Sequence, residues 1–392
     1  MKAILIVCDG MPDKPDNKGD TPLSVAYHPG LDFLAANGII GALNVGYEKD
    51  AETDEGLLKI LGCYDESYPG RGYIEAISTG IEINKGDVCM RANFATLGKD
   101  DLLVDRRAGR DDTGLDELAE KLDCTEIDGI RFYVEHTLGH RLAIVMHRLD
   151  GKALSFNIIG NDPKTTNVSV KQITPKTPNA KITASALNKF LRRARKILGE
   201  DPVNKKRKIP ANTIIVRSAG HMTITESFEE RYGKKGCVIA AHDTLQGIAK
   251  FLGMDFIKPV GATGKQDTDL DNKTNAVIEA MKKYGFILLH VNAFDQLSHD
   301  RKRDEKTDFI EKFDRAVIQR LLDNVDLDKT VIAVTSDHFS ISLDAKKGYE
   351  HSTEPVPFVV CGAGIKPSKS EKFDETSAAK AGVSKNIIKF LV

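Results

Sequence analysis

The sequence predicts an α/β protein, with a doubly wound, mostly parallel sheet and a smaller α+β domain inserted into it. Near both ends of the chain, short apolar runs rich in β-branched residues alternate with amphipathic helical stretches. Between these parts the pattern changes to short alternating runs separated by turn residues, which is typical of a separate α+β unit. We therefore expect one domain built from residues 1–86 and 232–392, and a second domain over residues 87–231.

The N-terminal part contains two predicted strands and two predicted helices. The run MKAILIVC predicts a buried strand that ends at Asp9. TPLSVAYHPGLDFLAANG predicts a helix, with Gly38 as its C-terminal stop. GIIGALNV then predicts a second strand, and TDEGLLKILG predicts a helix that begins near Thr53.

The middle of the chain carries short strand patterns and one long helix. The strand patterns are VCMRANFATLG, LLVDRRAGR, GIRFYVEHTLG and HRLAIVMHRL. KITASALNKFLRRARKIL predicts a helix with a strongly basic face, which we interpret as a solvated surface and not as a nucleic-acid site. ANTIIVRSAG predicts a further strand that ends at Arg217.

After residue 232 the chain returns to strands alternating with helices. The predicted strands are GCVIAAHD, FILLHV, KTVIAVTSDH and PVPFVVCG. The predicted helices are TLQGIAKFLG and KTDFIEKFDRAVIQRLLDNV. This alternation is the pattern of a parallel sheet with helices on its faces.

Composition excludes several classes of partner. The 392 residues carry 56 basic and 57 acidic side chains, a formal net charge of −1, so no overall field attracts nucleic acid or a membrane. No apolar run approaches the roughly 18 residues of a membrane span, and we expect a cytoplasmic protein. The six cysteines show no CxxC pairing, so we expect reduced, buried thiols. The oligomeric state stays open.

Acidic and imidazole side chains follow three of the predicted strands. Singly each has a simple structural explanation, such as a turn at Asp9-Gly10. Because the carboxyl ends of neighbouring parallel strands meet at one crevice, we expect these groups to converge on two divalent metal ions that serve phosphoryl transfer. Manganese is the expected ion, with zinc, cobalt, iron and magnesium as alternatives. The candidates around the two ions are Asp9, Thr53, Asp295, His299, Asp337, His338 and His351.

Distinctive segments run along nearly the whole chain, among them LIVCDGMPDKP, LKILGCYDESYPGRGYIEA, GDVCMRANFAT, VDRRAGR, GMDFIKPVGATG and HSTEPVP. In these segments the chain resembles the archaeal-type, cofactor-independent phosphoglycerate mutases of the alkaline phosphatase superfamily. The resemblance implies an alkaline-phosphatase-like fold. It also implies interconversion of 3-phosphoglycerate and 2-phosphoglycerate in glycolysis and gluconeogenesis. The substrate would be a small phosphorylated acid, and 2,3-bisphosphoglycerate would not be required.

The resemblance also divides the metal-binding residues between two ions. One ion would be held by Asp295, His299 and His351. The other would be held by Asp9, Asp337 and His338 together with the nucleophile.

The nucleophile is the place where the chain departs from the family. Alignment of the following ILG places Thr53 where the family has its nucleophilic serine, and Leu57 where the family has a histidine. A threonine hydroxyl can attack phosphorus as serine does, so the resemblance implies a phosphothreonyl enzyme. The alternative interpretation is that Thr53 is only the N-cap of its helix.

A phosphorylated acid also needs cationic partners and a group that moves a proton. Guanidinium groups match phosphate and carboxylate oxygens with two parallel hydrogen bonds, although surface salt bridging is the simpler explanation for any one of them. The substrate-binding candidates are Arg106, Arg107, Arg110, Arg217 and Lys265. Asp105 and Asp162 are candidates for moving the proton between the hydroxyl groups of the substrate.

Two other functions stay open. The departures at Glu55, Gly56, Leu57, Lys265 and Gln266 are compatible with a metal-dependent phosphatase or phosphotransferase that acts on another small phosphorylated metabolite. A non-catalytic paralogue that keeps the metal ions is the third possibility.

Overall fold

The computed structural model describes residues 1–48, 51–343, 351–368 and 370–392. The chain divides into two compact units, unit 1 with residues 1–65 and 226–392, and unit 2 with residues 66–225. A discontinuous domain with an insertion is therefore present, although both boundaries lie earlier than predicted.

The earlier boundary has a local cause in helix α4 (Arg71–Thr79). This helix packs against strands β3 (Val88–Leu97) and β11 (Thr213–Gly220) of unit 2. Gly72 permits the close approach, because a Cβ atom there would lie 2.5 Å from the carbonyl oxygen of Cys89. The predicted boundary at residue 86 placed this segment in the first domain, because the local sequence gives no information on the sheet against which a segment packs.

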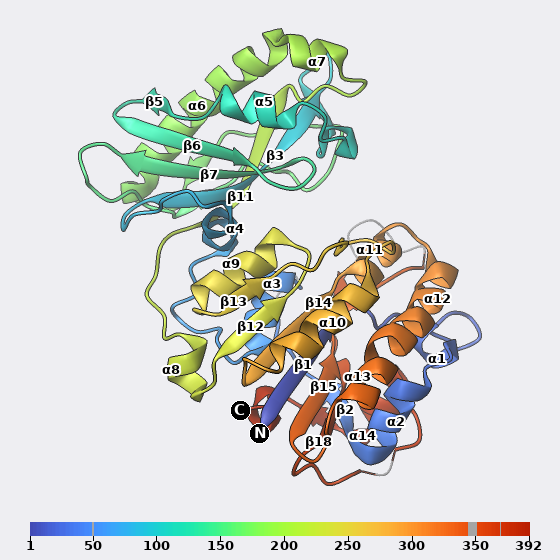
Figure 1. Ribbon diagram of the computed structural model, residues 1–392. Helices are drawn as coiled ribbons and strands as arrows, with labels where there is room; N and C mark the ends of the chain where they lie inside the picture. The colour runs from blue at the N-terminus through green and yellow to red at the C-terminus, as the bar shows by residue number, and fades with distance from the viewer. Residues whose placement is uncertain (49–50, 344–350, 369) are drawn as a thin grey trace. The chain divides into compact units, whose positions relative to one another are not determined.

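Unit 1 contains an eight-stranded sheet in the order β13-β12-β14-β1-β15-β18-β2-β19, much of which is visible in Figure 1. Strand β18 runs antiparallel to both of its neighbours, and the other pairs are parallel. The prediction of a mostly parallel sheet is confirmed. In sheet order the bounds are Asp255–Ile257, Gly236–Ile239, Phe286–Val291, Lys2–Cys8, Thr330–Thr335, Val356–Gly362, Gly38–Leu43 and Val383–Ser384.

Both faces of this sheet are covered. Alternate strand residues such as Ile4, Ile6 and Leu289 form one core cluster with apolar residues of α2 and α10–α13. The residues between them, such as Leu5 and Leu288, are also fully buried, so the other face is covered as well. The helices of unit 1 are α1 Pro22–Val25, α2 Pro29–Asn37, α3 Thr53–Ile60, α8 Phe228–Tyr232, α9 Asp243–Phe251, α10 Leu270–Ala280, α11 Ala293–His299, α12 Arg303–Phe313, α13 Arg320–Asn324 and α14 Glu375–Ala381.

Two predicted helices of unit 1 are interrupted. The first is two helices, α1 and α2, because Pro29 begins a new helix, and Gly38 is the first residue of β2 and not a helix stop. The second contains a π-helical segment, Asp314–Gln319, between α12 and α13. The buried Asp314 carboxylate of that segment accepts hydrogen bonds from the N–H groups of Gly30 (2.9 Å) and Leu31 (2.7 Å) at the start of α2. A helical repeat in the sequence cannot reveal such a tertiary cap.

Unit 2 is built on an antiparallel sheet in the order β5-β6-β7-β3-β4-β9, with β11 paired to β3. Helix α6 (Lys181–Glu200) covers one face through an apolar cluster that includes Phe94, Phe132 and Phe190. Arg192, Arg193 and Arg195 of α6 are exposed. The further bounds are β4 Leu102–Asp105, α5 Leu115–Glu120, β5 Thr125–Ile127, β6 Ile130–His136, β7 Arg141–Arg148, β8 Ile158–Ile159, β9 Val168–Ser169, β10 Thr174–Pro175 and α7 Pro202–Lys206.

All six cysteines carry free thiols, and five are buried while Cys124 is exposed. Among the described residues, no helix is both long and apolar enough to cross a membrane.

Candidate metal centre and anion-binding face

The predicted metal-binding residues of unit 1 come together at the carboxyl ends of three adjacent strands. Strand β1 lies between β14 and β15 and is parallel to both. Asp9 follows β1, Asp337 and His338 follow β15, and α11, which carries Asp295 and His299, follows β14. The short pair β16 (Phe339–Ser340) and β17 (His351–Ser352) places His351 opposite Ser340, close to His338. Each side chain therefore reaches the site because of strand order, as expected for a doubly wound sheet.

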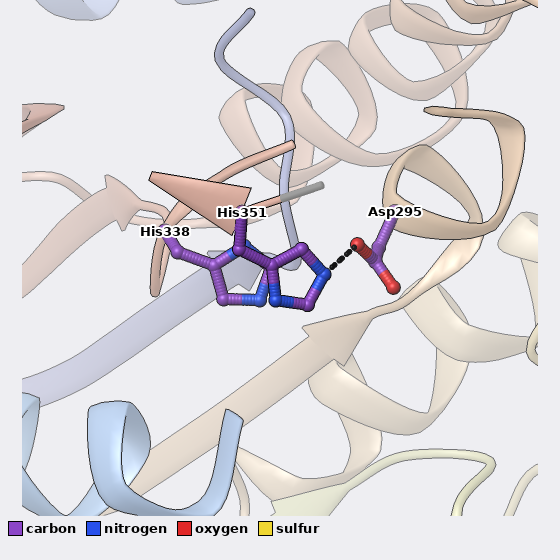
Figure 2. A group of neighbouring side chains, drawn as sticks. All are labelled: Asp295, His338 and His351. Carbon is purple, nitrogen blue, oxygen red and sulfur yellow. Dashed lines mark ion pairs between the residues drawn. The ribbon is translucent and has the colours of Figure 1, made fainter. Parts of the chain in front are cut away.

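One group of donors consists of Asp295, His299 and His351. The Nε2 atoms of His299 and His351 are 3.2 Å apart, and each lies close to Asp295, at 3.3 Å from Oδ2 and 3.2 Å from Oδ1 respectively. Figure 2 shows His351 directed at Asp295, with the His338 ring beside it. The His338 and His351 rings are stacked with centroids 3.9 Å apart.

A second group surrounds Asp9. His338 Nε2 lies 3.4 Å from Asp9 Oδ1 and 3.4 Å from Asp337 Oδ2. On the other side of the same carboxylate, His290 Nε2 lies 3.5 Å from Asp9 Oδ2. Asp9, Asp337, His338 and His290 are all buried.

The separations around Asp9, 3.4 to 3.5 Å, fit metal ligation better than direct hydrogen bonding. With bonds of about 2.1 Å in a tetrahedral arrangement, two donor atoms stand about 3.4 Å apart. Hydrogen bonds between nitrogen and oxygen are shorter, at about 2.7–3.2 Å. Among the described residues, the buried atoms Asp337 Oδ2, His338 Nε2 and His290 Nε2 have no hydrogen-bond partner. Carboxylate oxygens and imidazole nitrogens are the donor set of Mn²⁺, Zn²⁺ or Fe²⁺, so the residues present fit divalent ions.

Neighbouring groups hold these donors in place. The Ser340 hydroxyl donates to Asp295 Oδ1, and Gly10 N–H donates to Asp337 Oδ1 at 3.2 Å. His351 Nδ1 lies 3.0 Å from the carbonyl oxygen of Ala51, which favours the tautomer with hydrogen on Nδ1 and a free lone pair on Nε2.

Burial and the local charges set the protonation of the donors. Burial would raise the pKa of Asp295, but the adjacent His299 and His351 hold that pKa well below its usual value. Burial lowers the pKa of His338, and burial together with the nearby Lys273 and His242 lowers that of His290. Asp295 is therefore ionised, and His338 and His290 are neutral near pH 7, as metal ligands must be.

Thr53 is the first residue of α3, next to residues that contact this centre. The preceding carbonyl groups of Ala51 and Glu52 lie 3.0 Å from His351 Nδ1 and 3.5 Å from the hydroxyl of Tyr47. The same Tyr47 hydroxyl donates to the carbonyl oxygen of Asp337 at 3.1 Å. The N-cap interpretation of Thr53 is wrong, because Glu52 occupies the N-cap position and makes no side-chain capping bond.

Sequence reasoning missed His290 and His242. His290 lies inside strand β14 in the apolar run FILLHV, and His242 is the third residue after the end of β12. The available signal was the polar residue within a strand otherwise composed of buried apolar side chains. A single histidine in a buried strand can also be a core residue whose ring is fully hydrogen-bonded. Only the proximity of Asp9 to His290 favours a metal-binding role over that structural one.

In unit 2, the predicted arginines belong to a larger positive surface. Arg106 donates to Asp162 through two parallel bonds of 2.9 and 2.8 Å, and Arg217 Nε lies 3.7 Å from the same carboxylate. Asp105 accepts hydrogen bonds from the backbone N–H groups of Arg107 (2.6 Å) and Gly109 (3.1 Å). Asp105 thus shapes the loop that carries the arginines. The proton-transfer roles of Asp105 and Asp162 stay predictions.

Cross-strand register adds residues that the sequence did not reveal. Arg91 lies opposite Arg217, and Asn93 lies opposite Arg141. Directly paired residues share one face of a sheet, so these four side chains stand together on the face opposite the α6 core. Arg91 Nε, Asn93 Oδ1 and Arg217 Nε are buried without a hydrogen-bond partner among the described residues. We call Arg91, Asn93, Arg106, Arg107, Arg110, Arg141 and Arg217 the arginine face.

The arginine face shifts the pKa values of neighbouring groups. Burial and the nearby Arg141, Arg107, Arg91 and Arg110 lower the pKa of His140 to about 3. Glu75 is a buried counter-charge: burial would raise its pKa, but Arg91 and other arginines lower that pKa to about 2. Such a concentration of guanidinium groups is suited to a phosphate or carboxylate.

Lys265 belongs to unit 1 and is exposed. Its loop is closely packed. Gly264 lies so close to the His242 ring that a Cβ atom on residue 264 would overlap the ring. The role of Lys265 stays a prediction.

The fold and the two donor groups define the class of a metalloenzyme, and the model of the metalloenzyme superfamily matches residues 1–391. A 2,3-bisphosphoglycerate-independent phosphoglycerate mutase of Methanococcus aeolicus is 36% identical over 404 residues, covering 100% of this chain and 97% of the relative. The chain belongs to the family of cofactor-independent phosphoglycerate mutases, and the predicted family membership is confirmed.

Two solved structures are similar over the whole chain. The cofactor-independent phosphoglycerate mutase of Thermoplasma acidophilum has a TM-score of 0.66 at 31% identity, covering 100% of this chain and 99% of its own. A protein of Pyrococcus horikoshii has a TM-score of 0.82 at 29% identity, with 100% and 97% covered.

Proposed function

We propose that the protein interconverts 3-phosphoglycerate and 2-phosphoglycerate through a phosphothreonyl enzyme formed on Thr53. The observation that carries this proposal is the position of Thr53. It begins α3 directly after the carbonyl groups of Ala51 and Glu52, which contact His351 and, through Tyr47, Asp337. Family membership supports the same reaction, since the curated relatives are named for it.

The reaction proceeds in two balanced transfers. The Thr53 oxygen attacks phosphorus, the bond from phosphorus to O3 of the substrate breaks, and O3 takes up a proton while Thr53 loses one. The O2 hydroxyl of the released glycerate then attacks the phosphothreonine, which restores the threonine hydroxyl. The N-terminus of α3 favours a negatively charged group such as the transferring phosphoryl group. Two divalent ions, for which we propose Mn²⁺, would supply further positive charge to those oxygens.

The arginine face of unit 2 is suited to binding a carboxylate such as that of glycerate. Free glycerate must turn between the two steps without being lost, so its carboxylate needs strong, directional donors. Arg91 and Arg217 are suited to this role, because they stand opposite each other across β3 and β11. The Nε atom of each also lies near a carboxylate, at 3.3 Å from Glu75 and 3.7 Å from Asp162. Arg106 is already engaged by Asp162, so it orients that carboxylate.

The test combines a mutation with trapping of the intermediate. We expect Thr53→Ala to abolish activity in an enolase-coupled assay, by on the order of 10⁴-fold or more, as for other covalent nucleophiles. Acid quenching with radiolabelled 3-phosphoglycerate should leave label on Thr53 in the wild type and none in the variant. Thr307→Ala in α12 is the matched control and should keep both activity and label.

Two outcomes would overturn the proposal. A folded Thr53→Ala protein with wild-type activity would remove the covalent step. Release of inorganic phosphate without 2-phosphoglycerate would identify a phosphatase instead.

A further inference from the structure

His290 is a buried histidine of unit 1. The family resemblance assigns seven residues to the two metal ions, and His290 is not one of them. It stands in β14, opposite Val7 of β1 in the parallel register. Its flanking residues Leu289 and Val291 belong to the core cluster with α10–α13, so the alternation of the strand turns His290 to the other face of the sheet. On that face, beyond the end of β1, its Nε2 atom lies 3.5 Å from Asp9 Oδ2.

We infer that His290 is a direct ligand of the divalent ion that Asp9 and Asp337 hold. The ligand atoms of these three residues all lie within 4.8 Å of one another. The inference rests on the two-metal centre and not on the mutase reaction.

Three observations favour ligation over a structural role. His290 Nε2 is buried and makes no hydrogen bond, which is costly unless an ion occupies its lone pair. Its separation from Asp9 exceeds hydrogen-bond length and matches the spacing of two ligands on one ion. The backbone at His290 is also fixed in position, because β14 is paired along its length and the Lys273 ammonium group donates to the His290 carbonyl oxygen at 2.8 Å.

Charge balance supports the same assignment. Asp9 and Asp337 place two buried carboxylates at this point, and the nearby buried ammonium group of Lys273 donates to a backbone carbonyl. A cation beside Asp9 would neutralise both carboxylates, and His290 would complete its coordination on the side away from His338.

The test measures metal binding, with Co²⁺ as a spectroscopic probe. The variants are His290→Asn and His290→Leu, since leucine keeps apolar volume in a buried position. His28→Asn is the matched control. His28 is equally buried in unit 1, but its Nε2 is already bonded to the carbonyl oxygen of Leu23 at 2.8 Å.

We expect wild-type protein and the His28 variant to bind two equivalents of Co²⁺ in equilibrium dialysis. Both His290 variants should bind one of the two at least about 100-fold more weakly, and the visible spectrum of that weakened site should differ from wild type once high Co²⁺ fills it. Circular dichroism and thermal unfolding establish that each variant is folded.

Two results would overturn the inference. One is a folded His290 variant that binds two Co²⁺ ions with wild-type affinity. The other is a variant with weaker binding but an unchanged spectrum once both sites are filled, which would make His290 a partner of Asp9 and not a ligand. Failure of the mutase proposal would leave all of these binding measurements unaffected, so the two failures are distinguishable.

Discussion

Side chains of like charge are brought together in two different ways in this protein, as carboxylates in the metal centre of unit 1 and as guanidinium groups in the arginine face of unit 2. In unit 1, buried carboxylates such as Asp9 and Asp337 meet because parallel strands end at one edge. In unit 2, Arg91 and Arg217 meet because antiparallel register sets them opposite each other. Each concentration of one sign of charge is unfavourable alone and is relieved by an ion of the opposite sign. The difference teaches that strand order predicts the first kind of site, whereas the second depends on register.

The largest effect is expected from neutralising one carboxylate of the metal centre. Asp337→Asn should weaken binding of one divalent ion at least about 100-fold and reduce mutase activity accordingly. The metal-free variant should nevertheless unfold at a higher temperature than the metal-free wild type, because repulsion of buried Asp337 with Asp9 is relieved. Metal analysis and calorimetry measure both effects. Asp323→Asn, on the exposed side of α13, should change neither quantity. Unchanged metal content in Asp337→Asn would contradict the comparison.

The corresponding change in unit 2 is Arg217→Lys. It keeps the charge but removes the planar fork, so we expect KM for 3-phosphoglycerate to rise about 10-fold, with a smaller effect on kcat. Steady-state kinetics measures the changes in KM and kcat separately. The exposed Arg193 of α6 provides the control, since Arg193→Lys should leave both constants unchanged. Equal loss in the two variants would show that the arginine face has no special role.

A third prediction concerns the connection between α3 and the metal centre. The Tyr47 hydroxyl occupies the space where a Cβ atom of residue 56 would lie, so Gly56→Ala should destabilise unit 1 by about 1–3 kcal/mol. Urea unfolding measures the loss. Tyr47→Phe removes the overlapping hydroxyl and should restore much of the stability when combined with Gly56→Ala. If the double variant is no more stable than Gly56→Ala alone, the two residues are not packed as described.

The smallest effect is a titration that reports on the arginine face. Because burial and the surrounding arginines hold the pKa of His140 at about 3, the unfolded chain binds a proton at this residue below about pH 6.5 while the folded protein does not. His140 therefore makes stability fall as pH decreases from about 6.5 towards 3, and His140→Gln should flatten that dependence. Thermal unfolding at several pH values measures it.

A bound anion should change the same titration. Inorganic phosphate on the arginine face would offset the positive charge and raise the pKa of His140, which NMR titration can follow. An unchanged His140 pKa at saturating phosphate would place the anion elsewhere.

Much of unit 1 could be predicted from its sequence. Apolar strands of fixed period identified β1, β14 and β15, and the residues that follow them, such as Asp9 and Asp337, could be assigned to one edge. Local sequence patterns did not predict the features that tertiary contacts decide. Asp314 caps α2 from a π-helical segment, and α4 joins the inserted unit through its packing against β3 and β11.

The sequence by itself determined the fold class, the family and the residues placed at the strand ends of unit 1, because the hydrophobic period is a local property of the chain and parallel strands present their carboxyl ends at one edge of the sheet. Only the tertiary structure brought His290 to Asp9 and placed Arg91 opposite Arg217. The reason is physical: a one-residue shift in register moves a side chain to the other face of a sheet, and no local pattern records that register.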